Sequence, residues 1–140
     1  MDRKPKILLV EDDPDFQKIT NRVLQSKSFQ VVIADNGAEG LRKMRSEKPD
    51  LILLDIMMPE KDGFVVADEM SKDPTIANIP VLALTSFSES IGQPFPFKVS
   101  EYLPKSTKPA DLLAKIEKHL KNLGFFADQP KPPDYFPPVK

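Results

Sequence analysis

The sequence contains no cysteine and only one histidine, His119, among its 140 residues. Without cysteine the chain can form no disulfide, no zinc–thiolate site and no thiol nucleophile. Its formal net charge is −1 and no segment is rich in lysine or arginine, so it offers no basic surface for nucleic acid. No apolar run approaches membrane-spanning length, and the amino terminus shows no signal-peptide pattern. These absences predict a cytoplasmic protein that binds neither nucleic acid nor membrane.

The composition is that of one globular domain followed by an unusual carboxyl-terminal segment. Apolar residues make up 40% of the chain and charged residues 29%, which are ordinary values for a folded protein. The 15 prolines are concentrated in the last third, and the chain after Gly124 is too proline-rich to fold by itself. We therefore predict a folded domain over 1–124 and an extended, polyproline-like tail over 125–140.

Five apolar segments of strand length recur along the chain. They lie at Ile7–Val10, Phe29–Ala34, Leu51–Asp55, Ile79–Leu84 and Glu101–Leu103. The central one has no polar alternation until its final aspartate, which is typical of a strand buried on both faces. Because helical patterns fall between the segments, their order predicts an α/β fold with a parallel sheet and right-handed crossovers.

Helix signals separate these strands. A helix is expected after Asp13 or Asp15 with Pro14, after Asn36 as a cap, over Phe64–Ser71, and from Pro109 to a stop at Gly124. Residues at helical spacing are Phe16, Ile19, Thr20, Val23 and Leu24 in the first, Ala38, Leu41 and Met44 in the second, Val65, Val66 and Met70 in the third, and Leu112, Leu113, Ile116 and Leu120 in the last.

The segment over 87–98 breaks the alternation, because a helix is due there and the sequence opposes one. Gly92, Pro94 and Pro96 fall within it. In a helix interior a glycine costs roughly 1 kcal/mol and a proline roughly 3 kcal/mol. We expect at most one helical turn near 87–91 and an irregular loop afterwards, so that the fourth helix is shortened or missing.

Polar side chains collect where the predicted strands end. Glu11, Asp12 and Asp13 follow the first strand, Asp55 ends the third, Thr85 and Ser86 follow the fourth, and Lys105 follows the fifth. The carboxyl ends of parallel strands lie along one edge of the sheet, where open α/β folds bind their ligands. The sequence therefore predicts that several carboxylates, a hydroxyl and a lysine converge on one crevice.

Carboxylates gathered in this way need a cation or a proton among them. Two unit charges 4 Å apart repel by about 4 kcal/mol at an effective dielectric of about 20. A site of oxygen ligands without histidine or cysteine favours Mg²⁺ over zinc. Such an ion keeps positions for a phosphoryl group, for which Lys105 would supply positive charge and Thr85 a hydroxyl donor. Asp55 then remains as the nucleophile that forms an acyl phosphate.

Each residue also has a simpler interpretation. Asp55 alone is equally well explained as a turn residue or a helix cap, and Asp13 is better explained as a cap than as a metal ligand. Lys105 would be a surface lysine, Thr85 a strand end, Tyr102 a packing residue, and His119 a structural residue on the last helix.

The motifs together resemble the response-regulator receiver domains of two-component signalling, in a stand-alone form like the chemotaxis regulators. The matching segments are Val10–Asp13, Leu53–Pro59 with Asp62-Gly63, Leu84–Ser86 and Tyr102–Lys105. The resemblance implies a flavodoxin-like, doubly wound sheet of five strands in the order 2-1-3-4-5. It implies Mg²⁺ held by Asp12, Asp55 and the Met57 carbonyl, with Glu11 acting directly or through water.

The resemblance also implies how the site would work. A sensor histidine kinase or a histidine phosphotransfer protein would pass its phosphoryl group to Asp55. Thr85 would close on the phosphate while Tyr102 turns inward. Such a chain modifies itself and turns over no separate substrate, so it is not an enzyme in the usual sense. With one histidine and no nucleotide-binding loop it cannot be its own kinase.

The chain departs from the family in its loops and in its output. Ser106 follows Lys105 where the family has a proline with a cis bond, so we expect a trans peptide and an altered reach of Lys105. Only the tail follows the domain, so an unknown downstream protein must read the signal. Phe125, Phe126, Tyr135 and Phe136 are either exposed contacts for that partner or fold back over the missing helix.

Two rival functions stay open on the sequence alone. A degenerate receiver would have the same fold and bind partners without phosphorylation, and Ser106 with the 87–98 segment favours it. A small phosphatase with an aspartate nucleophile would instead use Asp12 or Asp13, after the first strand. That class usually needs a cap domain that the sequence does not contain.

Overall fold

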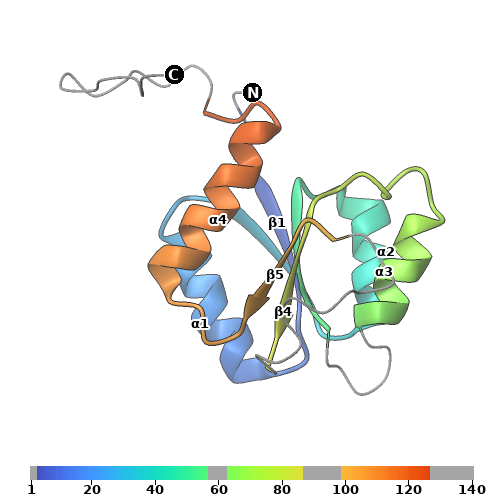
Figure 1. The fold of residues 1–140 in the computed structure, drawn as a ribbon, viewed down its shortest axis with the longest axis horizontal. Helices are drawn as coiled ribbons and strands as arrows, with labels where there is room; N and C mark the ends of the chain where they lie inside the picture. Colours follow the sequence, from blue (N-terminus) through green and yellow to red (C-terminus); the bar gives the residue numbers. More distant parts are fainter. Residues whose placement is uncertain (1–2, 57–62, 87–98, 127–140) are drawn as a thin grey trace.

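A computed structural model describes residues 3–56, 63–86 and 99–126 of the chain (Figure 1). The elements in chain order are β1 (Lys6–Val10), α1 (Pro14–Gln25), β2 (Gln30–Ala34), α2 (Gly37–Glu47), β3 (Leu51–Asp55), α3 (Gly63–Ser71), β4 (Val81–Thr85), β5 (Glu101–Pro104) and α4 (Pro109–Asn122). The strands form one parallel sheet in the order β2-β1-β3-β4-β5. The predicted fold class and strand order are confirmed.

Helices cover both faces of the sheet, with α1 and α4 on one side and α2 and α3 on the other (Figure 1). Successive residues of β1 consequently belong to different cores: Ile7 and Leu9 pack toward α1 and α4, whereas Leu8 and Val10 pack toward α2 and α3. All five residues of β3 are buried. The uninterrupted apolar run of this strand is therefore explained by its central place in the sheet.

Side-chain caps begin two of the helices at the residues expected from the sequence. The Asp13 side chain accepts a hydrogen bond from the backbone N–H of Asp15 (2.9 Å) and caps α1. Asn36 Oδ1 accepts one from the N–H of Glu39 (2.9 Å) and caps α2. Each cap satisfies a backbone donor that the helix itself leaves unpaired.

Three large apolar side chains of the described residues are exposed, those of Ile19, Val65 and Leu123. Val65, predicted to face inward, is 44% exposed, and Ile19 in α1 is 62% exposed. Both lie on helices whose inward stripe is already filled by neighbours, Val66 and Met70 in α3 and Thr20 and Leu24 in α1. The inward prediction for Val65 is therefore wrong, because the stripe of α3 is narrower than its apolar composition suggests.

The core extends beyond Gly124, where the folded domain was predicted to end. Gly124 has φ +95°, the left-handed conformation that glycine adopts readily, and the chain turns there. Phe125 then packs into the core beside α4 and is 2% exposed, and Phe126 packs against the same cluster. The expectation of an exposed partner contact at Phe125 is wrong, because its ring is part of the apolar core.

Other predictions fall outside the described residues. The shortened fourth helix lies in 87–98, while Tyr135 and Phe136 lie in 127–140. The part of the chain that the structure describes contains four helices. Among these described residues no helix combines the length and the apolar character needed to cross a bilayer.

Candidate functional site

The strand register brings the predicted polar residues together at one edge of the sheet, toward which the arrows of β4 and β5 point in Figure 1. Val10 pairs with Leu54, Asp55 with Leu84 and Thr85 with Pro104. Glu11 follows β1 and Lys105 follows β5, so both lie beside Asp55 and Thr85. We call this group, Glu11, Asp12, Asp55, Thr85 and Lys105, the carboxyl-terminal rim.

Three carboxylates form the acidic half of the rim. Glu11, Asp12 and Asp55 each place one oxygen within 4.8 Å of the others. Glu11 is fully buried and Asp55 is 1% exposed, whereas Asp12 is exposed. Asp55 is therefore almost completely buried, with its Oδ2 3.1 Å from the Lys105 ammonium. Asp12 is thus the acid of the group that solvent reaches.

Lys105 joins two of these acids. Its Nζ lies 2.6 Å from Glu11 Oε1 and donates a hydrogen bond to Asp55 Oδ2 (3.1 Å). Glu11 Oε1 is buried and is not aligned as a hydrogen-bond acceptor, so its contact with the ammonium is ionic. The Lys105–Ser106 peptide is trans, as predicted, and the side chain still reaches both acids. The Lys105 N–H donates to the Thr85 carbonyl (2.8 Å), which fixes where this side chain starts.

The balance of charge shifts the pKa of the buried groups. Burial raises the pKa of Glu11 to about 7, and the neighbouring Asp55 adds to the rise against the opposing effect of Lys105. Burial lowers the pKa of Lys105, but its contacts with Glu11 and Asp55 outweigh this and leave the pKa raised. One ammonium is thus shared between two buried carboxylates, and the rim carries more negative charge than Lys105 can compensate.

The backbone around Glu11 holds this acid in place. Its N–H donates to the Ala34 carbonyl (3.0 Å), and its carbonyl accepts from Gln17 Nε2 (2.5 Å). Glu11 Oε2 accepts from the N–H of Asp13 (3.1 Å). Asp13 itself caps α1 and does not belong to the close acidic group, which favours its interpretation as a cap.

Comparison with known proteins agrees with this arrangement. The family model of the response regulator receiver domain matches residues 7–117. The chain belongs to this family. The receiver domain of RstA from Klebsiella pneumoniae, solved in a BeF₃-activated form, is 34% identical and superposes with a TM-score of 0.74 over 83% of this chain and 98% of that one.

Curated relatives are longer than this receiver. It is 33% identical over 119 residues to the DNA-binding dual master transcriptional regulator RpaA of Synechocystis, covering 84% of this chain and 49% of RpaA. It is 35% identical over 115 residues to hybrid signal transduction histidine kinase D of Dictyostelium discoideum, covering 81% of this chain and 7% of that kinase. The receiver spans about half the length of the curated regulators that it matches.

Of the remaining predicted residues, Thr85 lies at the rim, whereas Tyr102 and His119 lie elsewhere on the last strand and helix. Thr85 is buried at the end of β4, and Tyr102 is half-buried on β5, where burial raises the pKa of its hydroxyl. His119 Nε2, on a side chain only 14% exposed, lies 3.1 Å from Glu101 Oε1 at the start of β5, which is the end of that strand opposite the rim. Met57, the expected carbonyl ligand, falls outside the described residues.

Two residues of the receiver contribute to the rim without having been singled out as site residues. A Cβ on Gly63 would lie 2.4 Å from Ile56 Cα and 2.8 Å from the Asp55 carbonyl oxygen, so only glycine allows α3 to start this close to the acid. The ring of Phe16 lies 4.7 Å from Lys105 Nζ. The helical spacing of Phe16 indicated only packing, and no sequence signal distinguishes the two roles.

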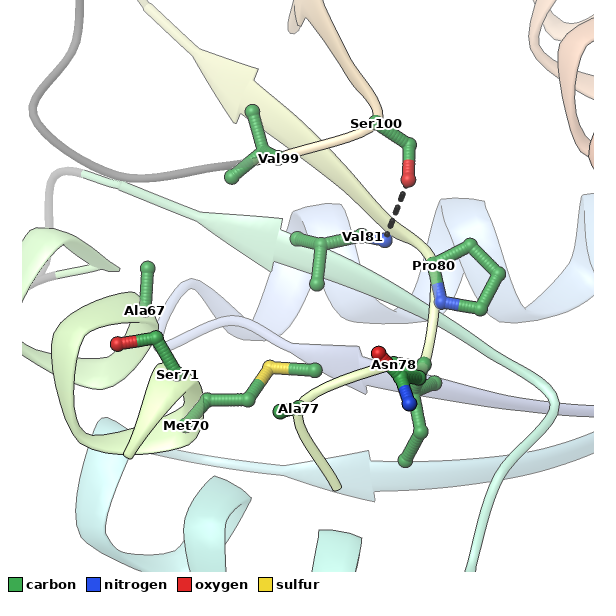
Figure 2. Close-up of a pocket in the computed structure, with 10 residues that line it drawn as sticks. Ala67, Met70, Ser71, Ala77, Asn78, Pro80, Val81, Val99 and Ser100 are labelled. Atoms are coloured by element: carbon green, nitrogen blue, oxygen red, sulfur yellow. Dashed lines mark hydrogen bonds between the residues drawn. The ribbon is translucent and has the colours of Figure 1, made fainter. Parts of the chain in front are cut away.

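A separate hollow of about 360 Å³ lies away from the rim, between the end of α3, the segment 77–80 and the start of β5 (Figure 2). None of the ten side chains that line it is ionisable. The Val81 N–H donates to Ser100 Oγ (3.2 Å) across one side of it. The described part of its lining therefore offers none of the ionisable side chains on which acid–base chemistry usually depends.

Proposed function

We propose that this receiver accepts a phosphoryl group on Asp55 from a kinase phosphohistidine, and that a protein partner reads the change. In this step a carboxylate oxygen of Asp55 forms a bond to phosphorus while the bond from phosphorus to the imidazole nitrogen breaks. The freed imidazole takes up a proton and becomes a neutral histidine. The observation that carries the proposal is the single ammonium of Lys105 placed against both Asp55 and Glu11.

Lys105 supports the transfer because its ammonium can follow the negative charge. It donates to Asp55 Oδ2 in the structure and would donate to a phosphoryl oxygen once that carboxylate has become an acyl phosphate. Thr85 ends β4 directly beside it and is proposed to donate its hydroxyl to another phosphoryl oxygen. In the same proposal Tyr102 turns inward as Thr85 closes.

The acids fit a hard divalent ion. Glu11, Asp12 and Asp55 offer three carboxylate oxygens within 4.8 Å of one another, and the buried Oε1 of Glu11 accepts no hydrogen bond although the Lys105 ammonium lies 2.6 Å away. Oxygen ligands without nitrogen or sulfur favour Mg²⁺. We propose that these three residues, with the Met57 carbonyl, hold Mg²⁺. When bound it would neutralise the oxygens of the transferring group.

The partners follow from the chemistry of the acceptor. A phosphohistidine donor belongs to a sensor histidine kinase or a histidine phosphotransfer protein. A change at one rim becomes a signal only when another protein distinguishes the two states. We propose that a downstream protein reads the folded domain together with the proline-rich segment that follows it, with no separate substrate turned over.

The proposal is tested with the full chain, Mg²⁺ and acetyl phosphate as a small donor, followed by intact-mass measurement. The wild type should gain one phosphoryl group per chain, only with Mg²⁺, and Asp55→Asn should gain none. Asp68→Asn is the matched control, because Asp68 pairs with Lys72 on the surface of α3 (3.1 Å) and lies away from the rim. This control should behave as the wild type.

Other outcomes would favour the rivals. If the wild type gains no group while its fold is intact, the chain is a degenerate receiver that binds partners without phosphorylation. If donor is hydrolysed over many turnovers and the activity disappears in Asp13→Asn but not in Asp55→Asn, the chain is a phosphatase whose nucleophile follows β1.

A further inference from the structure

The ring of Phe16 lies against the ammonium of Lys105. The distance from Nζ to the ring centroid is 4.7 Å, within the range in which an aromatic face attracts a cation. The Lys105 side chain is 18% exposed, so water screens this attraction only in part. The ammonium thus has Glu11, Asp55 and an aromatic ring around it.

The ring is held rigidly relative to the acids. Phe16 lies in the first turn of α1, whose start is fixed by the Asp13 cap. The next residue, Gln17, donates from Nε2 to the Glu11 carbonyl (2.5 Å) and to Asp35 Oδ1 (2.8 Å). These bonds fix the first turn of α1 to the residue that carries the buried carboxylate. The ring therefore occupies a set place beside the rim.

We propose that Phe16 is a positioning residue that keeps the Lys105 ammonium over the rim while its partner changes from a carboxylate to a phosphoryl oxygen. A ring face attracts a cation without a directional hydrogen bond, so the ammonium can move between oxygens without leaving the ring. An oxygen acceptor in the same place would compete for one of the three N–H donors. This role rests on the proposed phosphoryl transfer.

The attraction depends on the electrons of the ring rather than on its shape. Leucine would fill similar space without a negative face, and fluorine atoms withdraw electron density from the face while changing the shape little. Each fluorine added to the Phe16 ring should therefore weaken the attraction between the ring face and the Lys105 ammonium. A role in packing alone would be insensitive to this series.

The test replaces Phe16 with mono-, di- and trifluorinated phenylalanine in the full chain and measures the rate of phosphorylation by acetyl phosphate with Mg²⁺. The rate should fall stepwise, by roughly 3- to 10-fold at the trifluorinated residue. The same series at Phe29 is the control. Phe29 is buried just before β2, whose first residue pairs with the start of β1 at the opposite edge of the sheet. Its rates should stay constant.

A second measurement needs no phosphorylation. The ring current of Phe16 should shift the ε-methylene protons of Lys105 upfield, and Phe16→Leu should remove that shift. A shift that survives Phe16→Leu, or equal rates along the Phe16 series, would overturn the positioning role. If the wild type took up no phosphoryl group, the proposed function would fail, whereas the proton shift would still decide where Lys105 lies.

Discussion

Similar groups of charged and aromatic side chains lie at the two ends of the parallel strands, but the ratio of acids to cations differs. At the amino-terminal edge, Arg3 pairs with Asp50 through two contacts of 2.5 and 2.6 Å and stacks on the ring of Phe125 at 5.3 Å. At the carboxyl-terminal rim, Lys105 contacts Glu11 and Asp55 and lies over Phe16. Each end of the strands therefore has a cation, an aromatic ring and at least one acid, with Asp50 half-buried and Glu11 and Asp55 buried.

The difference lies in how many acids share the cation. Asp50 pairs one-to-one with Arg3 and also accepts a hydrogen bond from the backbone N–H of Lys6 (2.8 Å). Although burial would raise the pKa of Asp50, the Arg3 and Lys6 contacts keep it below its usual value. At the rim, burial and a neighbouring acid raise the pKa of Glu11 to about 7. A satisfied pair stabilises the fold, whereas an excess of acid leaves capacity for a bound cation.

The largest expected effect is on the rate of phosphoryl uptake, which should depend on Lys105 and not on Arg3. Lys105→Met should slow phosphoryl uptake from acetyl phosphate by about 100-fold, because the charge that faces the transferring oxygens is lost. Arg3→Met should leave the rate unchanged, since Arg3 lies at the opposite edge. Rates are followed by intact mass at saturating Mg²⁺. Equal slowing in both variants would mean that general destabilisation, not the rim charge, limits uptake.

The acids at the two ends of the strands should also change the free energy of unfolding in opposite directions as pH rises. Glu11 is protonated in the folded chain but not in the unfolded chain between pH 4.5 and about 7, so the free energy of unfolding should fall as pH rises through this window. The expected fall is on the order of 2 kcal/mol. Asp50, whose pKa is lowered, contributes stability above pH 3.8 that is lost as pH falls through its folded value.

Urea unfolding across this pH range without Mg²⁺ measures how the free energy of unfolding changes as Glu11 ionises. Glu11→Gln should flatten the fall between pH 4.5 and 7, and saturating Mg²⁺ should counter it by binding the ionised acids. If the free energy of unfolding of the wild type rises steadily from pH 4.5 to 7 without Mg²⁺, the negative charge of the rim does not destabilise the fold.

Neutralising one acid at each edge should change stability in opposite directions. Asp50→Asn should lower the free energy of unfolding by about 1 kcal/mol, because Arg3 loses its ionic partner at a half-exposed site. Asp55→Asn should raise it by about 1 kcal/mol at pH 7 without Mg²⁺, because one buried charge beside Glu11 is removed. Denaturant titration measures both, and a loss of stability in both variants would contradict the contrast.

The smallest expected effect concerns the shape of the cation. Arg3→Lys keeps the charge but loses the two parallel hydrogen bonds to Asp50, so the free energy of unfolding should fall by about 0.5 kcal/mol. Thermal unfolding at low and high salt measures it. A variant as stable as the wild type would show that only charge matters at this edge.

The sequence predicts the fold well because its strongest signals are local. The buried strand at Leu51–Asp55 and the cap at Asn36 appear where expected. The rim is predictable because parallel strands end at one edge. The exposure of Val65, the buried place of Phe125 and the contact of Phe16 with Lys105 depend on packing between distant segments, which periodicity does not encode.

The position of the phosphoryl group is the most direct test of the account. The chain is treated with Mg²⁺ and acetyl phosphate and then reduced with borohydride, which converts an aspartyl phosphate to homoserine, and the product is mapped by peptide mass spectrometry. The account predicts homoserine at position 55 alone, and none when Mg²⁺ is withheld. Homoserine at position 12 or 13, or an unmodified Asp55 in a folded chain, would contradict it.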